Sequence, residues 1–332
     1  MMKASKRQDP IYSSSEQGAQ WLIERQQTDG SLRGAVSLGD CYKTPFALAA
    51  TGHNRECERM LDYVTRTYWQ EDGDLDGKGL PWFQTFRIYP HGWLIMASMV
   101  RGRFDLAYSI LRFLLTYFDE RSGGFFATSQ ARHDQKGNQE LMSTSLAGLA
   151  CLWAGRLDVA ERTGRWVETL FRAQPDLSRG LYHVWNSEHG LVVEVPAENA
   201  ESFLVDATKP GQWYFQYGIS AAFLSSLSAA TGEKKWLRLA QEILRASRYC
   251  REDVYRIPRS GKIGWGAAWT YRLSHEAEDR DLAEKVAAGL ISLQDPDGSW
   301  RLPSSREGES GDAIDVTSEF VALQACISLV LE

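Results

Sequence analysis

The sequence lacks the features that mark most membrane and secreted proteins. No apolar run approaches the roughly 18 residues that a membrane-spanning helix needs. Residues 1–15 are polar and contain no apolar core of the kind found in secretory signals. We therefore expect a cytoplasmic protein without a membrane span.

Cysteine is scarce, and the spacing of the cysteines does not indicate a disulfide framework. The five cysteines lie far apart, and none forms a C-x-x-C pair. An odd number of widely spaced cysteines is typical of reduced thiols rather than of a disulfide scaffold.

Metal-binding patterns are also missing. Asp72-x-Asp74-x-Asp76-Gly77 begins like a calcium loop, but Phe83 occupies the position of its last ligand. His183 and His189 lack the H-E-x-x-H spacing of zinc enzymes. No metal and no other cofactor is therefore predicted.

No single charge sign dominates the chain. Its net charge is -6, and its lysines and arginines are scattered. This excludes the basic surface of a nucleic-acid-binding protein. Neither a glycine-rich phosphate loop nor a G-x-S-x-G elbow is present. A small-molecule substrate is the expected partner, and the sequence leaves the oligomeric state open.

Aromatic residues, in contrast, are abundant. The 332 residues include twelve tryptophans, thirteen tyrosines and thirteen phenylalanines. Part of this supply fills a large core, and the surplus favours a cavity with aromatic walls.

Glycines mark the ends of a series of predicted helices, and two kinds of helix end alternate along the chain. Some glycines end one helix and are followed at once by another, and others lie in turns that lead into longer, aromatic-rich loops. The first kind comprises Gly52, Gly102, Gly155 and Gly232, and the second lies near residues 30, 73, 123, 180, 261 and 298. This alternation predicts six helical hairpins with a period of roughly 45 to 70 residues.

The two helices of each hairpin have different faces. The helix after each short turn is amphipathic and belongs outside, whereas the helix after each long loop, such as the segment around Ile219–Ser225, is apolar nearly all round and belongs inside. The pattern predicts an all-α fold, an (α/α)6 toroid with inner and outer helix rings. We expect a single domain over residues 13–332, opened by a capping box at Ser13 and Glu16, after a flexible segment at residues 1–12.

One motif carries a resemblance to known families. Gln294-x-x-x-Gly298-x-Trp300 looks like the QW repeat of the terpenoid-cyclase and prenyltransferase toroids, and Trp21 to Leu32 repeats most of the surrounding pattern. The hairpin around Gly218 to Leu239 is similar to those of six-hairpin glycosidases and sugar epimerases. The aspartate-rich motifs of the terpene families are missing, since Asp74-Leu75-Asp76-Gly77 is not Asp-x-Asp-Asp.

The resemblance implies that the long loops and the N-terminal ends of the inner helices line one mouth of the ring. Partial positive charge at helix N-termini suits anionic groups there. The candidate catalytic residues at this mouth are Asp315, Glu319, Asp40, Tyr42 and His91. The candidate substrate-binding residues are Lys43, Trp82, Tyr89, Trp93, Gln212, Trp213, Tyr214, Lys262 and Trp265.

Structural roles compete with several of these assignments. Asp40 and Asp315 can equally cap helices, and His91 can equally be structural. Asp315 and Glu319 lie one turn apart on one helix face, so we expect them to repel and one of them to hold a proton near neutral pH. Substitution of either should then leave the melting temperature unchanged or raised.

The preferred function is a cofactor-independent enzyme that binds a small, largely hydrophobic substrate and catalyses cyclisation, isomerisation or elimination by acid/base groups. One alternative is a carbohydrate-active hydrolase or epimerase that uses the same cavity. The other is a binding toroid without catalysis. Several charged side chains facing inward would favour a sugar, and a dry wall with one or two acids would favour the cyclase.

Overall fold

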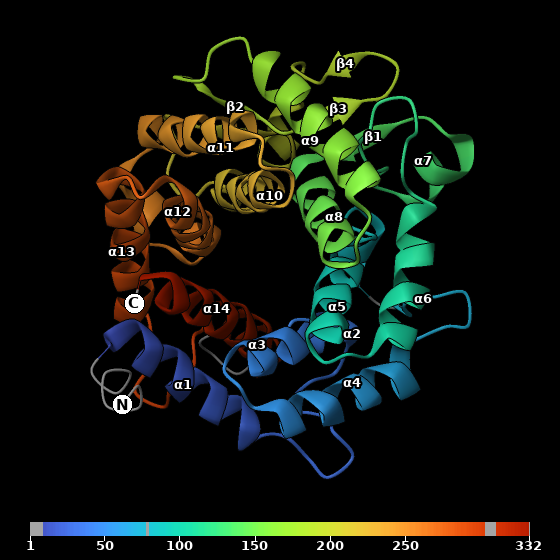
Figure 1. Cartoon of the computed structure of the whole chain (residues 1–332), viewed down its shortest axis with the longest axis vertical. Coiled ribbons are helices and arrows are strands. Elements are labelled where there is room, and N and C mark those ends of the chain that lie inside the picture. Colours follow the sequence, from blue (N-terminus) through green and yellow to red (C-terminus); the bar gives the residue numbers. More distant parts are fainter. Residues whose placement is uncertain (1–8, 78–79, 303–309, 332) are drawn as a thin grey trace.

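The helices form two concentric rings (Figure 1) in the computed structural model, which describes residues 9–77, 80–302 and 310–331. The inner ring consists of α3 (Thr44–Ala50), α5 (Tyr89–Val100), α8 (Leu141–Trp153), α10 (Phe215–Thr231), α12 (Gly261–Ser274) and α14 (Ser310–Leu331). The outer ring consists of α1 (Pro10–Ile23), α4 (Asn54–Tyr68), α6 (Phe104–Leu115), α9 (Leu157–Arg172), α11 (Lys234–Ala246) and α13 (Ala277–Ser292). The predicted (α/α)6 toroid is confirmed.

Burial follows the predicted division between the rings. The outer helix α11 buries one stripe, which includes Trp236, Leu239 and Ile243, and leaves its other face to solvent. The inner helix α10 is buried along most of its length. Small residues let inner helices approach closely, since a Cβ added at Gly218 of α10 would lie 2.0 Å from the backbone of Lys262 on α12.

The ring closes between the last helix and the first. α1 packs along α14, so these two helices form the sixth hairpin (Figure 1). Gln294 donates from Nε2 to the carbonyl oxygen of Ser14 at 2.9 Å, and Ser14 Oγ donates to Gln294 Oε1 at 2.8 Å. The Gln-x-x-Asp-Gly motif is thus a joint between neighbouring outer helices.

Glycine is required at this joint. Gly298 has a φ of +90°, and a Cβ there would lie 2.7 Å from the carbonyl oxygen of Gln17 on α1. Gly30, Gly73 and Gly123 make the same close approach to α4, α6 and α9. A side chain at any of these positions would push two outer helices apart.

The start of the chain differs from the prediction. α1 begins at Pro10, and the side chain of Asp9 accepts a hydrogen bond from the N–H of Ile11 at 2.9 Å. The capping box predicted at Ser13 is therefore wrong, and residues 9–12 belong to the helix and its cap. Residues 1–8 of the expected flexible segment lie outside the described residues.

Short elements in the long loops were not predicted. A short helix, α2 (Leu38–Cys41), precedes α3 and ends before α3 begins. A further short helix, α7 (Ser129–Asp134), follows α6. Two small antiparallel sheets lie mostly between α9 and α10 (Figure 1). One joins β1 (Asn138–Glu140), β3 (Val184–Asn186) and β4 (Gly190–Leu191), and the other joins β2 (Gly180–Tyr182) to β5 (Leu204–Asp206).

One helix segment within the described residues, Ala313–Leu331, is long and apolar enough by length and composition to cross a membrane, with a mean hydropathy of 1.6. The absence of a membrane-spanning segment expected from the sequence does not hold by this measure. Inside the ring, 61% of that window is buried, and α14 packs against α1, α3 and α12. Such burial is typical of a core helix.

Candidate active site

Two adjoining pockets open where the N-terminal ends of the inner helices meet. They hold about 780 and 610 Å³ of space, and Tyr89, Met142 and Asp315 line both. We call them together the polar mouth, because charged side chains gather there. Its charged lining comprises Asp40, Lys43, Arg259, Lys262, Asp315 and Glu319.

Two lysines and two carboxylates form one network in the polar mouth. Lys43 Nζ lies 2.9 Å from Asp315 Oδ2 and 2.6 Å from Glu319 Oε2. Lys262 Nζ binds the other oxygen of Glu319. Lys43 precedes α3, Lys262 begins α12, and both acids lie on α14, so three inner helices meet here.

Glu319 is held in its charged form. Burial alone would raise the pKa of Glu319, but the ammonium groups of Lys262 and Lys43 outweigh burial and lower that pKa to about 2. Burial likewise opposes the charged form of Lys43, yet Asp315 and Glu319 raise the pKa of Lys43 well above its ordinary value. Both lysines are thus ammonium ions at neutral pH and cannot serve as nucleophiles.

Asp315 behaves differently from Glu319. Burial raises the pKa of Asp315 above its ordinary value, although Lys43 opposes that rise. Its Oδ1 is buried and has no hydrogen-bond partner among the described residues. Asp315 lies inside α14 rather than at its cap, so the capping role considered for it is wrong. The side chain is 28% exposed, so a turn of the carboxylate brings the unpartnered oxygen to the mouth, where it can take up or release a proton.

The repulsion expected between Asp315 and Glu319 is only a minor influence. The two carboxylates have pKa values shifted in opposite directions, but burial and the lysines are the larger causes. Because Lys43 binds both acids, neutralising either one removes an attraction. We therefore expect substitution of either acid to lower stability rather than to leave it unchanged or raised.

Aromatic rings form the walls beside this network. The ring of Tyr42 lies 5.9 Å from that of Trp82 and 6.0 Å from that of Tyr89. Lys262 Nζ lies 5.8 Å from the ring of Tyr89 and 5.3 Å from the ring of Phe215. The polar mouth therefore combines charged groups with ring faces.

Asp40 lines the mouth as predicted, but its carboxylate is already engaged. Asp40 Oδ2 accepts hydrogen bonds from the N–H groups of Val36 and Ser37, at 2.7 and 2.9 Å. These bonds fix the turn before α2, which is the capping role considered for this residue.

The fold of the chain is similar to those of several solved sugar enzymes. No protein-family model and no curated protein sequence matches the chain. It superposes on the GH76 α-1,6-mannanase of Salegentibacter sp. HEL1_6 with a TM-score of 0.67 at 12% identity, covering 97% of this chain and 100% of that one. A D-mannose isomerase gives 0.73 at 11% identity, covering 98% of each chain. The unsaturated glucuronyl hydrolase of Bacillus sp. GL1 gives 0.62 at 14% identity, covering 98% and 97%. The chain shares their fold. At sequence identities of 11–14%, this similarity establishes the fold alone.

His91 does not face the mouth, contrary to the prediction. It is fully buried between the rings of Phe83 and Phe113, with centroids 6.4 and 5.0 Å away, and its Nε2 lies 3.3 Å from Asp74 Oδ1. Tyr89 and Trp93 lie one turn apart on the inward face of α5, and a residue midway between them points outward. His91 is therefore structural.

The loop before α10 also differs from the prediction. Tyr214 is buried, and its hydroxyl donates to Asp253 Oδ1 at 2.8 Å. Gln212 Oε1 accepts from the N–H of Asp206 at 3.1 Å. Both residues stabilise the loop through these hydrogen bonds, and neither is among the described residues that line the mouth. Trp213 lies against Phe86, with ring centroids 5.9 Å apart, next to the mouth wall.

Trp93 and Trp265 were predicted to bind substrate at the mouth, but they lie deeper. Their rings stack across the axis with centroids 6.1 Å apart, and both are buried. They form a partition inside the ring rather than a part of the mouth.

A buried carboxylate beside the mouth, Glu140, was not predicted from the sequence. Glu140 accepts hydrogen bonds from the N–H groups of Met142 and Ser143, both at 2.8 Å, and from Gln216 Nε2 at 2.7 Å. Burial raises the pKa of Glu140, and burial lowers the pKa of the neighbouring His183 to about 4. Glu140 precedes the apolar run of α8 directly, the position of an N-cap, which was the available signal.

Proposed function

We propose that the chain is a carbohydrate-active enzyme that transfers protons on a small sugar in the polar mouth, as an isomerase or epimerase. The observation that carries this proposal is the free Oδ1 of Asp315, next to the ammonium of Lys43. A carboxylate with an elevated pKa and a fixed cation are the groups that such a reaction needs.

The polarity of the mouth supports a sugar over a hydrocarbon. Charged side chains from several inner helices face the space, and the rings of Tyr42, Trp82 and Tyr89 stand beside them. Sugars present hydroxyl groups for hydrogen bonds and apolar ring faces for aromatic packing. A hydrocarbon substrate would leave the charges of this mouth without partners.

The placement of the carboxylates favours proton transfer over hydrolysis. Glycosidases use two carboxyl groups that flank the scissile bond. Here Asp315 and Glu319 lie on one helix and share the ammonium of Lys43, so neither stands across the pocket from the other. Glu319, with a pKa of about 2 and both oxygens bound to lysines, is a poor proton donor.

In the proposed reaction, Asp315 takes the proton from the carbon next to the sugar carbonyl. The electron pair of that C–H bond forms an enediolate, whose negative oxygen is stabilised by the ammonium of Lys43. Return of the proton to the neighbouring carbon, together with transfer of the hydroxyl proton on the first carbon to the former carbonyl oxygen, gives the isomer. Return of the proton to the same carbon after the enediolate has turned its other face to Asp315 gives the epimer. No oxidant or cofactor takes part.

The test is proton exchange on a free sugar. With D-mannose in D2O, we expect deuterium to enter the carbon next to the carbonyl together with formation of an isomer or epimer, measured by NMR. Asp315→Asn should lower this rate by roughly 10²-fold or more, the usual contribution of a general base. Asp62→Asn makes the same substitution on the exposed face of α4 and should retain the rate, which controls for effects of substitution and purification alone.

Hydrolysis is the second candidate, because the superposed mannanase and glucuronyl hydrolase carry that activity in their names. Release of sugar from α-1,6-mannotriose without any deuterium incorporation into D-mannose would replace the proposed function with glycoside hydrolysis. A full exchange rate in Asp315→Asn would remove that residue from the reaction.

The pH dependence offers an independent measurement. Asp315 acts as a carboxylate, so the rate should rise with pH through its elevated pKa. Lys43 lowers the pKa of Asp315, so Lys43→Met should raise it. The rising part of the pH–rate profile, which we call the acid limb, should then move to higher pH. Loss of Lys43 also lowers the maximal rate, so the quantity to compare is the pH at the midpoint of the acid limb.

Lys235→Met, which removes an exposed lysine on α11, should leave the limb in place. A limb that stays in place in Lys43→Met, or moves to lower pH, would show that Asp315 is not the group being titrated.

A further inference from the structure

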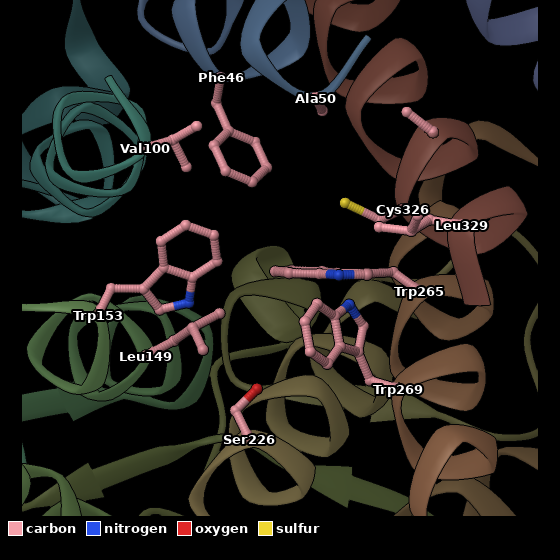
Figure 2. A pocket seen from close by; sticks show the side chains of 11 residues that line it. Phe46, Ala50, Val100, Leu149, Trp153, Ser226, Trp265, Trp269, Cys326 and Leu329 are labelled. Atoms are coloured by element: carbon pink, nitrogen blue, oxygen red, sulfur yellow. The ribbon is translucent and has the colours of Figure 1, made fainter. Parts of the chain in front are cut away.

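A second pocket lies at the opposite end of the inner helices. We call it the apolar chamber, and it holds about 660 Å³ of space. Figure 2 shows Phe46, Trp153, Trp265 and Cys326 pointing toward one another around this space. Its lining comprises Phe46, Ala50, Val100, Leu149, Trp153, Ser226, Trp265, Trp269, Ala325, Cys326 and Leu329.

The tryptophan partition separates the chamber from the polar mouth. Trp265 stacks on Trp93, whose ring in turn meets Tyr89 of the mouth edge-on at 6.4 Å. Among the described residues, no side chain lines both spaces. A ligand in the chamber therefore occupies a site of its own.

The chamber has no charged side chain among its described lining residues. Its polar groups are few, and two of them are buried indole N–H donors, of Trp265 and Trp269, that have no hydrogen-bond partner among the described residues. A buried donor without a partner is destabilising. Both nitrogens are covered by neighbouring atoms, so an indole must turn for its N–H to meet a ligand oxygen, and the bond then formed would remove that cost.

We propose that the apolar chamber is a binding site for a small, uncharged, ring-shaped molecule that carries one hydrogen-bond acceptor. The volume that compares with measured cavities is about 170 Å³, close to the roughly 150 Å³ of an apolar cavity that binds benzene. Apolar cavities of this kind stay dry and accept apolar guests. Flat walls such as the indoles of Trp153 and Trp269 favour a ring.

The entrance lies at the chamber rim, away from the polar mouth. Leu329 and Val100 there are 69% and 44% exposed. An apolar molecule can therefore enter from solvent without passing the charged network.

The proposal predicts saturable binding of the uncharged fluorophore N-phenyl-1-naphthylamine to the full chain, at one site. Ala50→Trp places an indole in the chamber from the exposed end of α3 and should weaken binding at least about tenfold. Ser226→Phe fills the chamber from α10 and should have the same effect. Ala277→Trp, at the exposed start of α13, is the matched control and should bind as the unchanged protein does.

Circular dichroism and melting temperature establish that each variant is folded. Absence of saturable binding to the unchanged protein would overturn the proposal, and so would an affinity in both filled variants that equals that of the unchanged protein. Asp315→Asn should leave the fluorophore affinity unchanged, and a loss there would place the probe in the mouth instead. These outcomes do not depend on whether the mouth acts on sugars.

A pair of competitors tests the hydrogen-bond donors. Indane and 1-indanone share a ring system, and only the ketone offers an acceptor. We expect 1-indanone to displace the fluorophore at lower concentration than indane does. Stronger displacement by indane would overturn the role given to the indole N–H groups.

Discussion

Replacing Glu319 with glutamine is expected to lower the free energy of unfolding by roughly 3–5 kcal/mol, the range for removing one partner of a buried ion pair. Glu319 binds the ammonium groups of both Lys43 and Lys262, which are only 5% and 3% exposed. The amide of glutamine leaves Lys262 without a counter-charge and Lys43 with Asp315 alone. Urea unfolding measures the change as a shift of the midpoint with an unchanged slope.

Two variants make this expectation specific. Glu242→Gln breaks the pair between Glu242 and Arg172 on the ring exterior and should change stability by no more than about 1 kcal/mol. Adding Lys262→Met to Glu319→Gln removes the unpaired ammonium and should restore much of the loss. Equal stability of Glu319→Gln and the unchanged protein would mean that the network contributes nothing.

The same carboxylate sets part of the acid stability. The pKa of Glu319 is about 2 in the folded chain, below its ordinary value of 4.5. Its contribution is therefore fully present above pH 4.5 and is lost as the pH falls toward 2. Glu319→Gln should lack this part of the pH dependence.

Replacing Trp300 with alanine is expected to cost roughly 3–5 kcal/mol of unfolding free energy, as for other large buried aromatic side chains. The indole is 1% exposed, donates from Nε1 to the carbonyl oxygen of Leu290 at 2.7 Å, and meets the ring of Phe320 edge-on at 5.7 Å. Its removal opens a cavity where α13, α14 and α1 meet. Thermal or urea unfolding measures the loss.

Trp300→Phe keeps most of the packing but loses the hydrogen bond, so its cost should lie between those of the unchanged protein and Trp300→Ala. Tyr249→Ala removes an aromatic side chain that is 58% exposed and should stay within about 0.5 kcal/mol. A similar cost for Tyr249→Ala and Trp300→Ala would contradict the assignment of Trp300 to a buried joint.

The architecture was predictable because it rests on local signals. A glycine such as Gly52 at a helix end and an apolar run such as Ile219–Ser225 are readable without any tertiary contact. The spacing of Asp315 and Glu319 on one helix face was readable for the same reason. The predicted hydrophobic substrate fits the polar mouth poorly. The apolar wall that would favour a cyclase lines the apolar chamber instead.

The site was less predictable because its contacts join distant segments. Lys43 and Asp315 are 272 residues apart, and Lys262 and Glu319 are 57 apart, so no pattern reveals that they pair. His91 was misplaced for a different reason. The motif Pro90-His91-Gly92 indicates local freedom, whereas helical periodicity through Tyr89 and Trp93 turns the imidazole away from the axis.

The closed ring also bears on the order in which the chain can fold. Synthesis releases α1 first, yet its partner α14 and the joint at Gln294 come from the far end, and the bonds between Ser14 and Gln294 span 280 residues. Closing so long a loop costs conformational entropy before any contact repays it. Until the last helix emerges from the ribosome, a nascent chain has an open arc of hairpins with two uncovered edges. Completion of the toroid therefore waits for α14, and a chain that lacks this helix exposes the apolar face that α14 covers.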